Sequence, residues 1–219
     1  MIVVIESHNA HRYARLLDEM FRLRARVFRD RLGWDVEVVD GRERDKYDDI
    51  GPVYLVCTDE RAREVKGSLR LLPTTGPTVL TDNFFDTLPD AVQLSAPTIW
   101  ECTRFCVDDR LSGKRRRDEL LHVSGTLIAG LGETAIKAGI ESILGNFDAM
   151  MLRIYRRIGC QVEVLGCTQR YGRPVYLGLF PVSESNLAKV KSRLKAAQPA
   201  AAELADGREP VEPAVSFQF

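Results

Sequence analysis

A chain of 219 residues is long enough to bury a core as one domain, and its 31 basic and 31 acidic side chains cancel to a formal net charge of zero. This balance excludes a globally basic nucleic-acid-binding protein, and the 28% of charged and 45% of hydrophobic residues exclude disorder of the whole chain. The longest apolar runs, such as 1–5 and 53–57, fall far short of the ~18 residues of a membrane span. We therefore expect neither a membrane span nor a secretory signal.

Cysteine usage indicates a reducing compartment and no zinc site. The five cysteines, at positions 57, 102, 106, 160 and 167, are an odd number and form no CxxC pair. This pattern argues against both a disulfide framework and a metal site. We expect reduced thiols, a cytoplasmic protein without a bound metal, and histidines 8, 11 and 122 on the surface.

Hydrophobic patterning predicts short strands and one long helix in the first half of the chain. The expected elements are a strand over 2–5, a helix over about 11–32, a long loop to 51, a hairpin of strands over 53–57 and 65–72, an irregular connection over 73–97, and a strand over 99–107. A loop as long as 33–51 inside a compact domain is usually functional.

The second half alternates helices and strands. The expected elements are a helix over 113–138, a strand over 140–144, a helix over 148–158, strands over 161–165 and 174–180, and a helix over 184–195. This order predicts a single α/β domain over residues 1–195, with one mixed sheet and helices on both faces. The Ala- and Pro-rich segment 196–219 is expected to form a poorly ordered tail.

Several ionisable residues occupy positions where packing alone favours apolar side chains. Arg24 lies four residues from both Met20 and Phe28, on the apolar face of its helix. A guanidinium there stays charged and is costly unless it is paired, so carboxylates are expected from elsewhere in the chain. The long loop and two strands supply three acidic and two basic candidates: Asp45, Asp48, Arg70, Glu101 and Arg104.

Two interpretations of these six residues are open. They can form a structural ion-pair network that ties helix, loop and sheet together. Alternatively, three positive and three negative groups can hold a zwitterionic ligand, with carboxylates meeting an ammonium and guanidiniums meeting a carboxylate. Phe28 and Trp34, beside this set, are expected either to pack in the core or to enclose a cationic or purine group.

The spacing of these residues matches a known signature. Eight residues fall in order on the spacings R-x3-F-x5-W, D-x2-D and E-x2-R-F: Arg24, Phe28, Trp34, Asp45, Asp48, Arg70, Glu101 and Arg104. Over about residues 1–195 the chain therefore resembles the acyl-homoserine-lactone synthases, the LuxI-type autoinducer synthases. Thr103 departs from the serine of many members but keeps the hydroxyl group.

The resemblance implies a fold similar to the GNAT acyltransferases and the synthesis of a quorum-sensing signal. It implies S-adenosylmethionine as one substrate, an acyl thioester of coenzyme A or acyl carrier protein as the other, and no cofactor. The amine forms an amide with the acyl group, and the methionine carboxylate then displaces methylthioadenosine to close the lactone. The implied contacts with S-adenosylmethionine are Arg24, Phe28, Trp34, Asp45, Asp48, Arg70, Thr103 and Phe105.

The implied catalytic residues are Glu101 and Arg104. A bound ammonium is no nucleophile, so a base must take its proton, and Glu101 is the candidate. Strict alternation places Glu101 and Arg104 on opposite faces of their strand. A bulge around Phe105 would remove this conflict and free backbone N–H groups for the oxyanion.

The resemblance also implies an acyl pocket that starts between the strands at Trp100 and Ile143. The helix that follows would supply the apolar lining, with Phe147, Met150, Met151 and Ile154. Trp100 and Phe147 either pack in the core without touching substrate or make the pocket short or flat. In the second case we expect a short, branched or aromatic acyl group, carried by coenzyme A.

A basic segment opens the long predicted helix, with Arg110, Lys114, Arg115, Arg116 and Arg117. It is similar to half of the phosphate-binding loop of GNAT enzymes, because Arg115 replaces the second glycine. We expect either an anion site for coenzyme A or carrier protein, or a solvated basic turn. Two other functions stay open: an N-acetyltransferase that uses acetyl-coenzyme A, and an inactive ligand-binding member of the fold.

Overall fold

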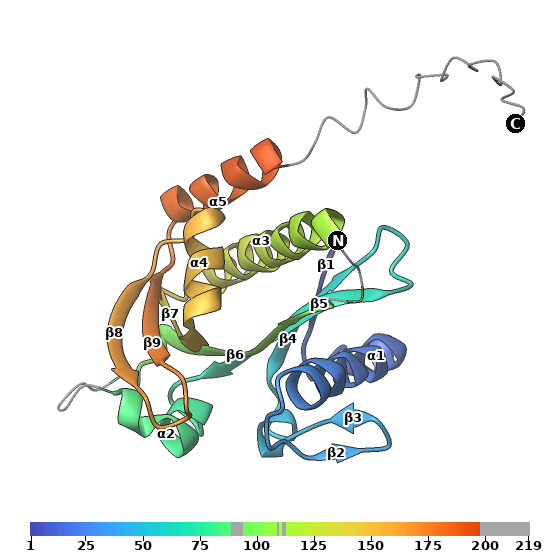
Figure 1. Cartoon of the computed structure of the whole chain (residues 1–219), viewed down its shortest axis with the longest axis horizontal. Helices are drawn as coiled ribbons and strands as arrows, with labels where there is room; N and C mark the ends of the chain where they lie inside the picture. The colour runs from blue at the N-terminus through green and yellow to red at the C-terminus, as the bar shows by residue number, and fades with distance from the viewer. Residues whose placement is uncertain (89–93, 109, 111–112, 198–219) are drawn as a thin grey trace, which may run out of the picture.

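A seven-stranded sheet separates two layers of helices (Figure 1). The structure, a computed structural model, describes residues 1–88, 94–108, 110 and 113–197, with only the backbone of 113–117 and 197. The strand order is β1-β4-β5-β6-β7-β9-β8, and neighbouring strands are antiparallel except for the parallel pair β6–β7. The strands are β1 (Ile2–Ile5), β4 (Val53–Thr58), β5 (Val65–Pro73), β6 (Ile99–Val107), β7 (Ser142–Asp148), β8 (Glu163–Thr168) and β9 (Val175–Pro181).

Helices cover both faces of this sheet, as predicted. On one face α1 (Ala14–Arg24) packs against β5 and β6. On the other face α3 (Gly113–Lys137) packs against β4 and β5 and carries α5 (Glu184–Ala197), and α4 (Ala149–Arg157) lies beside α3. Within the described ranges, no helix is long and apolar enough to cross a membrane. The predicted tail lies, from residue 198 onward, outside the described residues.

The predicted helix over 11–32 is three elements in succession. A 3₁₀ turn (Ala10–Tyr13) leads into α1, and a π-helix (Ala25–Arg31) follows it. π turns are rare and occur frequently at functional sites. The wider turn lets the adjacent residues Val27 and Phe28 both lie in the core, each 2% exposed.

Two segments predicted as irregular contain short elements with polar caps. The loop 33–51 contains the hairpin β2 (Val38–Val39) and β3 (Arg42–Glu43), and a 3₁₀ turn (Lys46–Asp48) that begins with a capping box between Asp45 and Asp48. The connection 73–97 contains α2 (Val79–Asn83), capped by the hydroxyl of Thr78. Elements this short carry no periodic apolar pattern, which is why the sequence does not indicate them.

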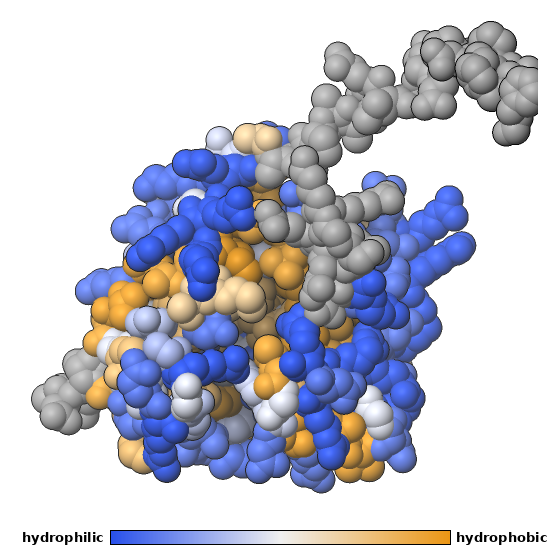
Figure 2. Space-filling model, viewed as in Figure 1, coloured by the Kyte–Doolittle hydropathy of each residue, from blue (hydrophilic) through white to orange (hydrophobic). Residues whose placement is uncertain are grey.

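The two parallel strands in the middle of the sheet diverge. β6 and β7 pair over only three positions, from Ile99 with Ser142 to Glu101 with Leu144. Beyond them β6 continues on β5, and β7 continues on β9 to Asp148, whose carboxylate caps α4. Apolar side chains gather near this region, over α4 and the adjoining part of α3, and hydrophilic side chains surround them (Figure 2).

Candidate active site

Charged side chains fill the space between α1, β3 and the sheet. Arg24, the last residue of α1, is 1% exposed; it forms two bonds of 2.9 Å with Asp48 and one of 2.5 Å with Glu43. Arg70 on β5 is fully buried and bonds Asp45 at 2.5 Å and Asp48 at 2.8 Å. The carboxylates that the position of Arg24 requires are therefore present.

Arg104 completes this set at its open edge. Its Nη2 lies 3.0 Å from Glu43 Oε1 and 2.8 Å from Asp45 Oδ2. The side chains of Arg104 and Asp45 are 14% and 19% exposed, whereas the other members are almost completely buried. We call these six residues, three positive and three negative, the charge cluster: Arg24, Glu43, Asp45, Asp48, Arg70 and Arg104.

Mutual pairing stabilises the charged forms of Asp48 and Arg24 in the charge cluster. Burial favours the neutral form of Asp48, but the bonds and charges of Arg24 and Arg70 outweigh it and hold the pKa of this carboxyl far below its usual range. Burial also opposes the charge on Arg24, yet Asp48 and Glu43 raise the pKa of the guanidinium above its usual value. The phenol of Tyr54 donates a further bond of 2.7 Å to Asp48.

A β-bulge in β6 brings Arg104 to the face of the charge cluster. The register between β5 and β6 shifts, so that Arg104 and Phe105 lie opposite the single residue Leu69. Arg104 has a φ of 51°, in the left-handed region that non-glycine residues rarely occupy. The bulge predicted around Phe105 is confirmed.

Glu101 lies apart from the charge cluster, which corrects the predicted grouping. Its carboxylate is 1% exposed and accepts the backbone N–H groups of Val79 at 2.9 Å and Leu80 at 2.7 Å, in the first turn of α2. Burial raises the pKa of this carboxyl to about 7, although the two backbone bonds and the Arg70 charge oppose the rise. A carboxylate with this pKa is poised to exchange a proton near neutral pH.

Glu43 takes the place predicted for Glu101 in the balanced set. It is fully buried and bonds both Arg24 and Arg104. The sequence interpretation missed it, because β3 is too short to show a pattern. The one signal that points to it is the acidic character of the segment 33–51, beside an arginine that required carboxylates.

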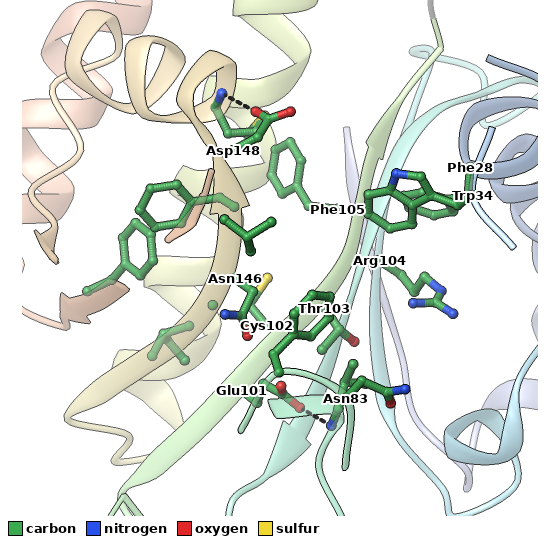
Figure 3. A pocket seen from close by; sticks show the side chains of 18 of the residues that line it. Phe28, Trp34, Asn83, Glu101, Cys102, Thr103, Arg104, Phe105, Asn146 and Asp148 are labelled. Atoms are coloured by element: carbon green, nitrogen blue, oxygen red, sulfur yellow. Dashed lines mark hydrogen bonds between the residues drawn. The ribbon is translucent and has the colours of Figure 1, made fainter. Parts of the chain in front are cut away.

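A cavity of about 1200 Å³ passes through the sheet where β6 and β7 diverge (Figure 3). On the side of α1 its lining includes Asp45, Thr103 and Arg104, and on the side of α4 it includes Phe147. Glu101 lines it near the point where the two strands separate. Among the described residues, no cluster of His, Cys, Asp and Glu side chains is arranged to hold a metal ion.

Phe28 and Trp34 form an aromatic wall of the cavity beside the charge cluster (Figure 3). Their rings are stacked, with centroids 5.0 Å apart and planes inclined by 24°. The guanidinium of Arg104 lies 5.4 Å from the centroid of Phe28. Phe28 is 2% exposed and packs in the core, Trp34 is 37% exposed, and both line the cavity.

Comparison with known proteins assigns this arrangement to a family. The family model of autoinducer synthases matches residues 7–190. The acyl-homoserine-lactone synthase of Rhizobium etli is 42% identical over 181 residues, which are 82% of this chain and 84% of that protein. The chain belongs to the autoinducer synthase family. The predicted family, the predicted function as an acyl-homoserine-lactone synthase and the acyltransferase class are thereby confirmed.

Further relatives agree with this assignment. The isovaleryl-homoserine lactone synthase of Bradyrhizobium diazoefficiens is 33% identical over 167 residues, 76% of this chain and 72% of that protein. The structure of the CoA-dependent acyl-homoserine lactone synthase BjaI, with SAM and isopentyl-CoA, has a TM-score of 0.78 and 28% identity, and the match covers 89% of each chain. A putative N-acetyltransferase from Lactobacillus plantarum shares the fold alone, with a TM-score of 0.51 and 17% identity over 83% of this chain and 99% of that one.

In this synthase the cavity reaches only part of the residues predicted to contact S-adenosylmethionine. Its lining contains five of the eight: Phe28, Trp34, Asp45, Thr103 and Phe105. Arg104, which was predicted as a catalytic residue, lines it as well. The other three, Arg24, Asp48 and Arg70, lie behind, in the buried part of the charge cluster. Arg24 pairs with Glu43 and Arg70 pairs with Asp45, both of which line the cavity, whereas Asp48 pairs with Arg24 and Arg70. Contact of these three residues with S-adenosylmethionine stays a prediction.

Four of the six residues predicted for the acyl pocket lie at the cavity, and their contact with an acyl group stays a prediction. Ile143, Phe147, Met150 and Met151 line the cavity. Trp100 does not, because it lies where β6 and β7 still pair; its indole N–H donates to the carbonyl of Pro97 at 3.2 Å and its ring packs under α3. Ile154 is buried in the cluster beneath α4. Of the two alternatives for Trp100, the structure therefore favours packing in the core.

The basic segment of the synthase is described only at its start. The guanidinium of Arg110 pairs with Asp108 and lies 2.9 Å from Glu64, so carboxylates of this chain already occupy it. The side chains of Lys114, Arg115, Arg116 and Arg117 lie outside the described residues. Their role as an anion site stays a prediction.

Removal of Arg24 should test how strongly the charge cluster supports the fold. Arg24→Ala leaves Glu43 and Asp48 buried without their main partner, so we expect the free energy of unfolding to fall by about 3–5 kcal/mol. Arg15→Ala is the matched control: its pair with Glu19 is largely exposed, and its loss should cost less than about 1 kcal/mol. Urea denaturation measures both values. Equal losses in the two variants would contradict this account of the charge cluster.

Proposed function

We propose that this synthase makes an acyl-homoserine lactone from S-adenosylmethionine and a short, branched or aromatic acyl thioester of coenzyme A. The observation that carries the proposal is the cavity through the sheet. It joins a charged half, suited to a zwitterionic amino acid, to an apolar half, suited to an acyl group. Glu101 lies between the two halves, where the amine and the thioester would meet.

The charged half complements S-adenosylmethionine group by group. Arg104 would receive the methionine carboxylate and Asp45 the ammonium, since these are the most exposed members of the charge cluster. The stacked pair Phe28 and Trp34 offers ring faces to the adenine and to the cationic sulfonium. The buried members hold Arg104 and Asp45 in position before substrate arrives, which lowers the entropic cost of binding.

Amide formation needs one proton acceptor and one oxyanion site. Glu101 takes a proton from the ammonium, and the freed nitrogen attacks the thioester carbonyl. Backbone N–H groups at the bulge of Arg104 and Phe105 would hold the oxyanion, because the extra residue of a bulge is left out of the strand ladder. The nitrogen then loses a second proton and the C–S bond of the thioester breaks, so that one of the two protons leaves on the thiol and the other passes to solvent.

Lactone formation needs no further base. A carboxylate oxygen attacks the methylene carbon attached to the sulfonium, the C–S bond breaks, and methylthioadenosine leaves as a neutral thioether. The enzyme contributes by holding the chain folded so that the reacting atoms stay close. The enclosed position of Arg104, beside Phe28, suits this role.

The apolar half favours compact acyl groups. The ring of Phe147 is fixed by Tyr155 and Phe180, with centroids 5.2 and 5.9 Å away, and Gly178 leaves room for it, because a Cβ there would lie 2.5 Å from the ring. A rigid aromatic wall shortens the space available to a straight chain. The isovaleryl product named for one relative and the CoA dependence named for BjaI support the same choice of donor.

The product profile tests this function and the role of Phe147. We expect the purified protein, given S-adenosylmethionine and a panel of acyl-coenzyme A and acyl-carrier thioesters, to form lactones from short, branched or aromatic coenzyme A thioesters, detected by mass spectrometry. Phe147→Ala should shift the preference towards longer chains, by about fourfold for each methylene accommodated, since a buried methylene is worth ~0.8 kcal/mol. Trp100→Phe is the control, because Trp100 does not line the cavity.

Two results of this assay would contradict the proposal. Absence of lactone with every thioester would overturn the function itself. A wild-type preference for chains of about ten carbons or more, where burial alone favours length, would overturn the compact pocket and leave the function standing.

Glu101→Gln should slow amide formation without weakening the binding of S-adenosylmethionine. The amide keeps the shape of the carboxylate but cannot take a proton, so we expect single-turnover acylation to fall by about 10²–10⁴-fold. The wild-type rate should drop as the pH falls through about 7, where Glu101 becomes protonated. This acidic limb of the pH–rate profile should be absent from the variant. Glu133→Gln removes an exposed carboxylate and is the control. A loss below about threefold in a folded Glu101→Gln protein would point to another base.

A further inference from the structure

Tyr47 lies between the charge cluster and the helix that holds Glu101. Its side chain is 4% exposed, and its ring packs against Leu72 of β5 and Val79 of α2. The guanidinium of Arg70 lies 5.3 Å from the centre of the same ring. Tyr47 therefore contacts a buried member of the charge cluster on one side and α2 on the other.

Hydrogen bonds fix Tyr47 at both ends. Its backbone N–H donates to Asp45 Oδ1 at 3.0 Å, and its phenol donates to Asp82 Oδ2 at 2.7 Å. Lys46 bonds the same oxygen of Asp82 at 2.6 Å. A continuous set of bonded groups thus runs from Asp45, which faces the charged half of the cavity, to Asp82 on α2.

α2 depends on such contacts for its position. It has five residues, and a helix this short has no appreciable stability of its own. Its far end is held by Tyr171, whose phenol donates to the carbonyl of Asn83. Its first turn supplies the backbone N–H groups of Val79 and Leu80 that bind Glu101. A small movement of α2 therefore changes the bonds that Glu101 receives.

We propose that Tyr47 is a positioning residue that sets the hydrogen bonding of Glu101 by holding α2 against the charge cluster. This inference rests on the function proposed above, in which Glu101 acts as the base. Tyr47 does not have to contact a reacting atom, because it acts through Asp82 and α2. Asp45 accepts the backbone N–H of Tyr47 and is also the expected partner of the substrate ammonium. The contacts of Tyr47 therefore link binding of the ammonium to the hydrogen bonding of Glu101.

The groups around Glu101 fix the direction of the expected effect. Arg70 on β5 and the two N–H groups of α2 favour the carboxylate, whereas burial and the negative charge of Asp82 favour the protonated form. Tyr47 and the thiol of Cys102 are the further titratable groups near it. When α2 loosens, the N–H bonds weaken, so the pKa of Glu101 rises and its base form is lost at a higher pH.

Tyr47→Phe tests the proposal, because it keeps the ring and removes only the bonds of the phenol to α2, the one of 2.7 Å to Asp82 and a longer one of 3.4 Å to Asn83. We expect the acidic limb of the acylation rate to move to higher pH by about half a unit or more, so that the rate on that limb falls about threefold or more. The plateau rate at high pH and the affinity for S-adenosylmethionine, measured by calorimetry, should change much less. A uniform loss at every pH, or no change, would overturn the proposal.

Asp82→Asn separates positioning from charge. The carboxamide oxygen still accepts the phenol bond of Tyr47, while the negative charge that favours protonation of Glu101 is gone. The acidic limb of the Asp82→Asn variant is therefore expected at the same pH as that of the wild type or at a lower pH. A shift to higher pH as large as that of Tyr47→Phe would contradict the proposed mechanism.

Tyr54→Phe is the matched control. It removes a phenol bond of the same length, 2.7 Å, from Asp48 of the charge cluster, but Tyr54 has no bond to α2 within the described chain. Its pH profile should keep the wild-type limb, whatever its effect on stability, and an equal shift would overturn the proposal. Failure of the wild type to make lactone would instead overturn the function, so the two failures are distinguishable.

Discussion

A guanidinium cannot shed its charge inside a protein, and the burial of Arg24 places that constraint at the centre of the molecule. Two carboxylates, on Glu43 and Asp48, must come close enough to balance it, and they come from a segment with almost no regular structure of its own. In this segment, ion pairs and hydrogen bonds take the place of the apolar packing that holds most helices and strands. The charge cluster thus orders the segment after α1 and presents Asp45 and Arg104 to the cavity without substrate.

The divergence of β6 and β7 connects the charge cluster to the apolar side of the sheet. A closed sheet would separate the charged face from the apolar face, whereas the gap after Glu101 joins them in one cavity. Glu101 lies outside the charge cluster and accepts two backbone N–H groups. Burial raises its pKa in spite of these bonds, whereas the arginines of the charge cluster lower the pKa of Asp48. The same protein therefore keeps one carboxylate permanently ionised for structure and leaves another able to exchange a proton.

Much of this arrangement could be predicted from the sequence, because periodicity and charge report the right constraints. The helical position of Arg24 required carboxylates, and the conflict between Glu101 and Arg104 required the bulge that β6 contains. Periodicity could not indicate Glu43, since a strand of two residues shows no pattern, and it could not indicate the short helix α2 for the same reason. The place of Trp100, in the core or at the pocket, stayed open because alternation gives the face of a strand but not the point at which two strands part.

Glu101 titrates apart from the charge cluster in this arrangement, and infrared difference spectroscopy measures that titration most directly. Spectra recorded between about pH 5.5 and 8.5 should show a protonated carboxyl band that disappears with a midpoint near neutral pH, well above the ordinary range of a glutamate. The band should be absent from Glu101→Gln and retained in Glu133→Gln. A wild-type protein whose carboxyl groups all titrate in the ordinary range, with no band lost in Glu101→Gln, would contradict the claim.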